Sequence, residues 1–407
     1  DELIGIFKTT PNNAGVGIFD LRPVLETFVS PDNLGSTTGN GSRYKTSDVP
    51  HPIHLIDKYS QNTNSMKYFA IRFKVEYATD PTASVGAPDN DVDSDQYIMF
   101  NGVLQYDDVL TLENGNYGYS IEKYFANGYP TELLSNAPLT QYARLTDYGT
   151  LPFLNFLGAG NTTMTGVASF NLTYYWDGGS STETIAQNWT NGGVTNYSSW
   201  TAVFLLYFGG FPANLQNHST IFAAAIVSGL THYTIKYSNG YGNVSETYTI
   251  NIICPNERGY EGIRLTWLNQ WGVWDYYTFN MKSTRTVTTN RTSYTQLGGT
   301  WNESTFKISG YKGGKKNFRV NSTEKIKLNT DFVTEAEGVW LEELINSNEV
   351  YIVNGFSTDV SNTITNKYIE PVVLTTSSFV RKTIANDKLM QYTIELEKSK
   401  MQRTQSV

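Results

Sequence analysis

Tight-turn dipeptides between short runs of β-forming residues are the feature that most limits what this chain can fold into. Asn101-Gly102 stands between Tyr97–Phe100 and Val103–Tyr106. Asn-Gly between two apolar runs is the strongest short signal for a β-hairpin, because both turn residues need positive φ angles. The chain is therefore expected to contain antiparallel hairpins.

The same pattern continues through the middle of the chain. Asp177-Gly178-Gly179 follows Phe170–Trp176, and an Asn-Gly pair separates Thr231–Tyr237 from Val244–Ile253. Successive strands at a spacing of about ten residues are typical of antiparallel sandwiches. Aromatic residues make up 14% of the chain and include 28 Tyr, which favours half-buried pleated surfaces.

Two short helices interrupt the predicted strands. Asp20 is a candidate N-cap for residues 21–29, where apolar residues recur at helical spacing. Thr334-Glu-Ala-Glu337 matches a capping box and predicts a helix over 335–347. The expected fold class is mainly β, with multiple antiparallel β-sandwich or split-barrel domains and two short α-helices.

The length of 407 residues predicts two to four domains. We expect an N-terminal β domain with long loops over 1–150 and a central β-sandwich domain over 151–254. A C-terminal β domain with one helix is expected over 255–407.

The two most apolar stretches are short. Thr201–Phe211 and Thr220–Leu230 fall below the ~20 residues that a helix needs to cross a bilayer, so no membrane span is expected. Trp200–Tyr207 and Thr220–Val227, which overlap these stretches, are predicted to be buried strands.

Charge and cysteine content exclude some classes of protein. The net charge is −8, whereas nucleic-acid binders usually carry a basic stripe, so no nucleic-acid partner is expected. The single cysteine, Cys254, allows no intrachain disulfide, and its place at the end of an apolar strand predicts a buried thiol.

Metal-binding patterns are weak in this sequence. Asp89, Asp91, Asp93 and Asp95 alternate, which suits Ca²⁺, but the Gly and Glu of an EF-hand loop are missing. A solvated acidic loop is the simpler prediction. Two histidines, at positions 51 and 54, have no acidic or cysteine partner nearby in sequence. We therefore predict no metal site and no cofactor.

Catalytic motifs that are local in sequence are also missing, so no catalytic residue is predicted. No Gly-x-Ser-x-Gly elbow occurs, and Lys312-Gly-Gly-Lys-Lys316 lacks the spacing of a phosphate loop, so it is interpreted as a basic hairpin tip. A carboxylate pair for glycoside hydrolysis would meet only in three dimensions. The chain is predicted not to be an enzyme, with a polysaccharide-degrading enzyme as one alternative.

The densest aromatic stretch supplies the candidate site. Trp and Tyr are favoured at protein interfaces and in sugar-binding platforms, and they also build cores. The candidate interface residues are Trp267, Trp271, Trp274, Tyr276 and Tyr277. Ordinary core packing and a carbohydrate-binding face are the two alternatives.

The order of several motifs carries a resemblance to a known family. These motifs are Gly15-Val-Gly-Ile-Phe-Asp-Leu21, Ile263-Arg-Leu-Thr-Trp-Leu-Asn269, Asp275-Tyr-Tyr-Thr-Phe279, Trp340–Ile345, Ile369–Leu374, Phe379–Lys382 and Tyr392-Thr-Ile-Glu-Leu-Glu397. Their order resembles that of large tail-associated virion proteins of tailed bacteriophages, especially phages of Bacteroidetes-type and marine hosts. The likeness covers the N-terminal fifth and the C-terminal third of the chain.

The resemblance implies a structural component of the tail hub, baseplate or distal tail, assembled in the host cytoplasm and present in the virion. Such a subunit would form a symmetric ring with copies of itself and dock neighbouring tail proteins. The long segments 30–66 and 107–150 are candidate inter-subunit arms, because long structureless loops are usually functional. A receptor- or carbohydrate-binding fibre or adhesin module, with a host-surface glycan as partner, is the alternative.

Overall fold

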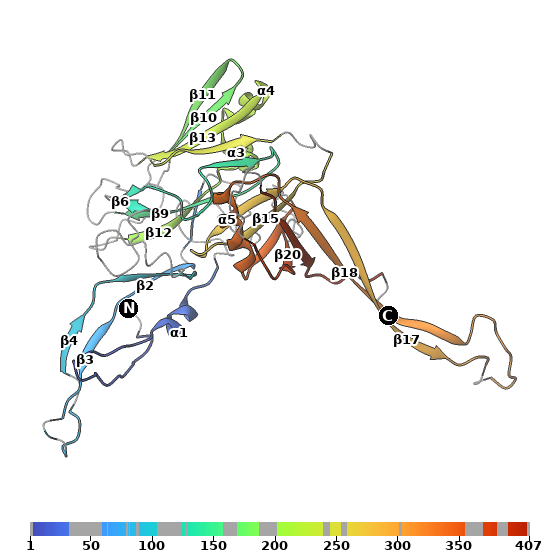
Figure 1. The fold of residues 1–407 in the computed structure, drawn as a ribbon, viewed down its shortest axis with the longest axis horizontal. Helices are drawn as coiled ribbons and strands as arrows, with labels where there is room; N and C mark the ends of the chain where they lie inside the picture. Colours follow the sequence, from blue (N-terminus) through green and yellow to red (C-terminus); the bar gives the residue numbers. More distant parts are fainter. Residues whose placement is uncertain are drawn as a thin grey trace. The chain divides into compact units, whose positions relative to one another are not determined.

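The computed structural model of the chain is mainly β and contains several antiparallel sheets, which confirms the predicted fold class (Figure 1). The structure describes residues 3–31, 59–62, 64–78, 80, 82–86, 89–103, 124–126, 129–157, 169–186, 202–238, 245–253, 259–300, 303–354, 369–380 and 390–404.

The chain divides into two compact units. Unit 1 comprises residues 1–253, 268–275 and 358–361, and unit 2 comprises the rest. Strands from the predicted domains 1–150 and 151–254 pair with one another inside unit 1, so these two segments are described together.

Unit 1 contains a five-stranded sheet in the order β11-β10-β13-β14-β8. Its strands are β8 (Thr140–Ala143), β10 (Ser169–Trp176), β11 (Gly179–Ala186), β13 (Leu230–Ser238) and β14 (Tyr248–Ile252). The predicted hairpin at Asp177-Gly178 is confirmed: β10 and β11 pair antiparallel, and Gly178 takes a φ of +80° at the turn. The predicted pairing of the next two strands, β13 and β14, is confirmed as well.

A three-stranded sheet, in the order β1-β12-β9, packs against the five-stranded sheet through aromatic rings. Its strands are β1 (Tyr59–Asn62), β9 (Leu151–Leu157) and β12 (Ala202–Phe208). Phe170 of β10 stacks on Phe208 of β12 with ring centroids 3.9 Å apart, and Phe153 of β9 stacks on Tyr237 of β13 at 4.9 Å. These buried rings form the core of a sandwich-like pair of sheets.

One predicted strand is a helix. The run Thr220–Val227 was expected to be a buried strand, but α4 spans Phe222–Val227 and follows α3, which spans Pro212–His218. The sequence of α4 contains three consecutive Ala residues, and Ala has the highest helix propensity. The Ser219 hydroxyl accepts hydrogen bonds from the N–H groups of Ile221 and Phe222 and so satisfies donors at the start of the helix.

The predicted long loop 107–150 is partly incorrect. Its described portion from residue 131 onward packs into unit 1, with Leu133, Leu134 and Asp147 buried and β8 paired in the five-stranded sheet. Residues 104–123 lie outside the described residues, as do residues 32–58 of the other predicted loop and the cysteine at position 254.

A short helix and three two-stranded ribbons complete unit 1. The predicted N-terminal helix is confirmed as α1 (Arg22–Leu25) followed by the 3-10 turn η1 (Glu26–Phe28). Three two-stranded sheets pair β2 with β5, β3 with β4, and β6 with β7. Their bounds are β2 (Met66–Phe69), β3 (Arg72–Val75), β4 (Asp89–Asp93), β5 (Tyr97–Phe100), β6 (Phe125–Ala126) and β7 (Tyr129–Pro130).

Unit 2 is built on a seven-stranded sheet in the order β16-β15-β19-β20-β21-β18-β17. The strands are β15 (Ile263–Leu268), β16 (Trp274–Phe279), β17 (Thr284–Gln296), β18 (Gly314–Asn329), β19 (Val350–Val353), β20 (Ile369–Leu374) and β21 (Thr393–Lys398). The residues that join β15 to β16, from Leu268 to Asp275, are counted with unit 1.

The second predicted helix is α5, which spans Glu335–Asn346 and begins with the expected capping box. The Thr334 hydroxyl accepts from the Glu337 N–H, and the Glu337 carboxylate accepts from the Thr334 N–H at 2.7 Å. Trp340, Leu341 and Leu344 are buried and form the apolar side of the helix.

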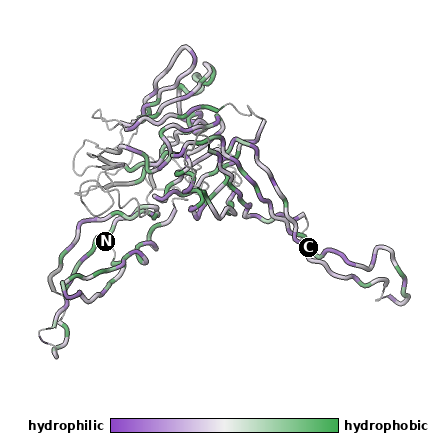
Figure 2. The backbone as a smooth tube through the Cα atoms, viewed as in Figure 1, coloured by the Kyte–Doolittle hydropathy of each residue, from purple (hydrophilic) through white to green (hydrophobic). Residues whose placement is uncertain are grey.

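Strands β17 and β18 form a ribbon that continues past the rest of the sheet in unit 2 (Figure 1). Strand β21 pairs with β18 only over Lys325–Asn329, and an isolated bridge joins Ser322 to Gln402. We call residues 291–320 the arm. Figure 2 shows hydrophilic and hydrophobic residues along its described part, and the described side chains of β17 from Thr284 to Thr295 are all exposed.

Within unit 1, two backbone segments cross with no room for a side chain. A Cβ on Gly272 would lie 1.9 Å from the Asn101 carbonyl oxygen, and one on Gly102 would lie 1.9 Å from the Gln270 carbonyl oxygen. Gly272 also has a φ of +71°, which glycine adopts without strain. The Gly of the predicted Asn101-Gly102 turn is thus needed for this crossing, and most of the predicted partner strand Val103–Tyr106 lies outside the described residues.

The crossing predicts a large difference between two glycine substitutions. Gly272→Ala should lower the free energy of unfolding by about 3 kcal/mol or more, because it adds both a left-handed alanine and an overpacked contact. Gly178→Ala, with a φ of +80° but nothing within 4 Å of the added Cβ, should cost only about 1 kcal/mol. Urea unfolding measures both, and equal losses would contradict the crossing.

Candidate functional site

The five aromatic residues predicted as an interface lie inside the protein. Trp267, Trp271, Trp274 and Tyr276 are at most 4% exposed, and Tyr277 is half-buried. Buried side chains have no surface to offer a second molecule or a sugar ring. The core alternative accounts for these positions, and the interface and carbohydrate alternatives find no support there.

Trp267 and Trp271 each have identifiable aromatic packing partners. In unit 2, Trp340 of α5 lies over the sheet, with its ring centroid 5.2 Å from that of Trp267 and 6.0 Å from that of Tyr277. In unit 1, Trp271 lies edge-on to Phe100 at 5.7 Å and to Tyr124 at 4.9 Å. Aromatic pairs at these separations stabilise a core beyond the area that they bury.

The acidic run at 89–95 was predicted as a solvated loop; it is largely a strand, and its described carboxylates Asp93 and Asp95 are exposed as predicted. Residues Asp89–Asp93 form β4, and Arg72 of β3 makes two hydrogen bonds to the Asp93 carboxylate, at 2.6 and 3.0 Å. The guanidinium of Arg72, which bonds the ionised carboxylate directly, lowers the pKa of Asp93. The two histidines at 51 and 54 lie outside the described residues.

A polar cluster missed from the sequence surrounds Glu183 of β11. One carboxylate oxygen accepts from the Thr220 N–H and hydroxyl, each at 2.9 Å, and the other accepts from the hydroxyls of Ser219 and Tyr174. Burial opposes ionisation of Glu183, but these hydrogen bonds outweigh it and lower its pKa. The cluster ties β10 and β11 to the start of α4, which is a structural role.

The lowered pKa sets the pH dependence of this contribution. A carboxylate with a lowered folded-state pKa stabilises the fold above its ordinary pKa of 4.5, and the stabilisation is lost as the pH falls through the folded value. Glu183→Gln should cost about 1 kcal/mol at neutral pH, because Glu183 is only half-buried, and much less at pH ~3. Urea unfolding at both pH values tests this, with the exposed Glu303→Gln as control. A loss independent of pH would contradict it.

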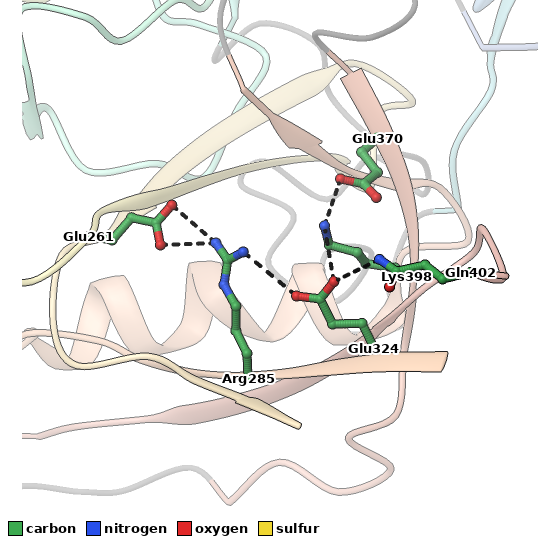
Figure 3. Close-up of polar contacts among 6 residues, drawn as sticks. All are labelled: Glu261, Arg285, Glu324, Glu370, Lys398 and Gln402. Carbon is green, nitrogen blue, oxygen red and sulfur yellow. Dashed lines mark hydrogen bonds and ion pairs between the residues drawn. The ribbon is translucent and has the colours of Figure 1, made fainter. Parts of the chain in front are cut away.

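An ionic cluster lies at the root of the arm (Figure 3). Glu324 of β18 is 8% exposed and lies between two cations. Its Oε1 is 3.6 Å from Nη1 of Arg285, on β17, and its Oε2 is 3.5 Å from Nζ of Lys398, on β21. A buried carboxylate that is held by two cations fixes the strands that carry them.

The same cations reach further carboxylates. Nη2 of Arg285 bonds both oxygens of Glu261, at 3.0 and 2.9 Å, and Lys398 Nζ lies 3.2 Å from Glu370 of β20. The Gln402 amide donates to Glu324 at 3.3 Å. Figure 3 shows how these side chains connect four strands at the place where the arm leaves the sheet. We call these six residues the root cluster.

The arm itself exposes a set of large apolar side chains. These are Tyr294, Leu297, Phe306, Ile308, Tyr311, Phe318 and Val320. Ile308 is 85% exposed and Tyr311 74% exposed, so they contact little of the rest of the chain. The prediction of a basic hairpin tip at Lys312–Lys316 is wrong, because Gly314, Lys315 and Lys316 begin β18 and pair with the last residues of β17, and residues 297–313 connect the two strands.

Only part of the arm could be recognised from the sequence. The basic residues Lys312–Lys316 were recognised, but neither the length of the ribbon nor its pairing was predicted. The signal that was present is the Thr-rich run over Thr284–Gln296, which has no apolar face.

The chain matches no family model, no curated protein and no solved structure in comparisons with all three. Among the residues that the structure describes, no helix is long and apolar enough to cross a membrane. Nor does the described part of the chain bring together three or more His, Cys, Asp or Glu that could hold a metal ion.

The root cluster predicts unequal effects of two carboxylate substitutions. Glu324→Gln should lower the free energy of unfolding by about 2–3 kcal/mol, because it leaves Arg285 and Lys398 without their shared buried partner. Glu395→Gln should change it by less than about 0.5 kcal/mol, because Glu395 pairs with Lys327 at an exposed site. Urea unfolding measures both, and a cost below 1 kcal/mol for Glu324→Gln would contradict a fixing role.

Proposed function

We propose that this protein is a structural subunit that assembles with copies of itself through the arm. The observation that carries the proposal is a ribbon of two long strands, of 13 and 16 residues. Its outer part exposes large apolar side chains, and its base is held by the root cluster. No catalytic step is assigned to the chain. A receptor-binding module is the alternative, and the burial of the tryptophans removes the aromatic face on which that alternative depended.

The physical argument is that the arm is costly unless it has a partner. An isolated two-stranded ribbon is marginally stable in water, because neither face is covered. Outward of Ser322, no described strand other than β17 pairs with β18, so both outer edges present free backbone groups. Proteins usually block such edges or pair them with another chain.

The root of the arm fits this role. The root cluster and the pairing of β18 with β21 hold the base of the ribbon on the seven-stranded sheet. A fixed base limits the directions in which the arm can point and lowers the entropy lost when it docks.

Placement of the subunit in the tail of a bacteriophage rests on the resemblance of its motifs. Tail hub and baseplate proteins form closed rings, and an arm that docks on a different surface of the next copy generates a ring when the rotation closes. The proposal is therefore a ring-forming tail subunit that also contacts neighbouring tail proteins.

Sedimentation velocity and negative-stain microscopy of the full chain test the proposal. Arg291 and Val320 are paired opposite one another, so residues 292–319 can be replaced by a two-residue Asn-Gly turn. The full chain should sediment as a closed oligomer, and the shortened variant as a monomer, because the docking element is gone.

A matched control shortens a different hairpin in the same way. Tyr174 and Ser181 are also paired, so replacement of residues 175–180 by Asn-Gly shortens the β10–β11 hairpin while leaving the arm intact. This control should remain oligomeric. A full chain that stays monomeric at its highest soluble concentration would overturn the proposed function.

A further inference from the structure

We infer that the arm of one copy docks on the β3–β4 ribbon of the next copy. The inference rests on the proposed function and names the surface that receives the arm. The β3–β4 ribbon, residues 72–95, is a two-stranded sheet in unit 1 whose strands pair only with each other among the described residues. Like the arm, it combines exposed apolar side chains with a strong charge.

The arm supplies a basic surface with aromatic side chains. Residues 291–320 contain six Lys and Arg (Arg291, Lys307, Lys312, Lys315, Lys316 and Arg319) and one acid, Glu303, so their net charge is 6 − 1 = +5. The rest of the chain then carries −8 − 5 = −13. The arm is thus a basic element on an acidic protein.

The apolar side chains of the arm lie near these cations. The Lys312 ammonium lies 5.9 Å from the ring centroid of Tyr311, and Lys316 Nζ donates to the Tyr311 carbonyl at 2.7 Å. Tyr294 and Phe318 meet edge to face with their ring centroids 6.5 Å apart. Aromatic groups beside cations suit a partner that is both acidic and partly apolar.

The β3–β4 ribbon has the complementary character. It contains Arg72 and Lys74 against six acids (Glu76, Asp80, Asp89, Asp91, Asp93 and Asp95), so its net charge is 2 − 6 = −4. Five large apolar side chains on or beside its strands are exposed: Phe73, Val75, Tyr77, Val85 and Val92. Phe73 is the least exposed of these, at 46%.

Complementary charge and matching apolar surface together point to a contact between these two ribbons. Opposite potentials steer the encounter and exclude wrong partners, and the apolar side chains supply the surface that is buried. Because the donor and the receiving surface are different parts of the chain, the contact is heterologous and repeats from copy to copy. When the rotation between successive copies closes, this contact forms the ring that the proposed function requires.

Two charge-reversed variants test the pairing. Lys307→Glu with Lys312→Glu and Lys315→Glu changes the net charge of the arm from +5 to −1 and leaves the Lys316 bond to Tyr311 in place. Asp89→Lys with Asp91→Lys and Asp95→Lys changes the net charge of the receiving ribbon from −4 to +2 and leaves the ion pair of Asp93 with Arg72 intact. Each variant alone should self-associate at least about tenfold more weakly than the original chain in sedimentation velocity, because like charges then face each other.

Mixing the two variants is the decisive measurement. In the mixture, the acidic arm of one variant meets the basic ribbon of the other, and the remaining basic arm meets an unchanged acidic ribbon. Association should therefore return to within about threefold of the original strength, and it should weaken as salt is raised. Lys282→Glu with Lys400→Glu, at two exposed sites outside both ribbons, is the control and should associate normally.

The possible outcomes separate the two proposals. If the full chain associates and loss of the arm dissociates it, but the charge-reversed variants behave like the control, the arm docks elsewhere and only this inference is overturned. Failure of the mixture to recover would overturn it as well. A chain that is monomeric and instead binds phosphatidylserine vesicles through Lys312 and Lys315 would overturn both.

Discussion

The position of Glu324 between Arg285 and Lys398 is the interaction on which the outer part of unit 2 depends. Because the β17–β18 ribbon is long, a small rotation at its base would displace its outer end by a much larger distance. The carboxylate and its two cations join strands β17, β18 and β21 at that base, and the second carboxylate on Lys398 adds β20. Because Glu324 is buried, water competes with these contacts less than at an exposed ion pair.

The sequence predicted those elements whose signals are local. Both hydrogen bonds of a capping box join residues that are three positions apart in the sequence. The start of α5 could therefore be placed from Thr334 and Glu337 alone. The hairpin at Gly178 depends on a positive φ angle that two turn residues reveal. In both cases the information lies in residues that contact each other within the element.

The incorrect predictions have two other causes. In the first, apolar character alone does not decide between helix and strand. The run around Ala223 to Ala225 is apolar like a core strand, yet its Ala content and the cap at Ser219 make it helical. Trp267 and Trp271 were assigned to an interface because tryptophan suits both a surface patch and a core. Their burial depends on Trp340 and Tyr124, which are distant in sequence, and no local pattern could reveal those contacts.

The pairing of the arm contains one irregularity with a consequence for its reach. Thr292 lies opposite Arg319, but Ser293 lies opposite Asn317, so Phe318 is an extra residue on β18 and forms a bulge. Side chains alternate between the two faces of a ribbon, and the bulge therefore determines on which face Lys315 and Lys316 lie relative to the root. A related protein could lengthen this arm by two residues on each strand, about 6.7 Å, without turning its tip over. A change of one residue on each strand would turn the tip over. If copies associate through the arm as proposed, the distance between neighbouring copies should therefore change in steps of two residues on each strand.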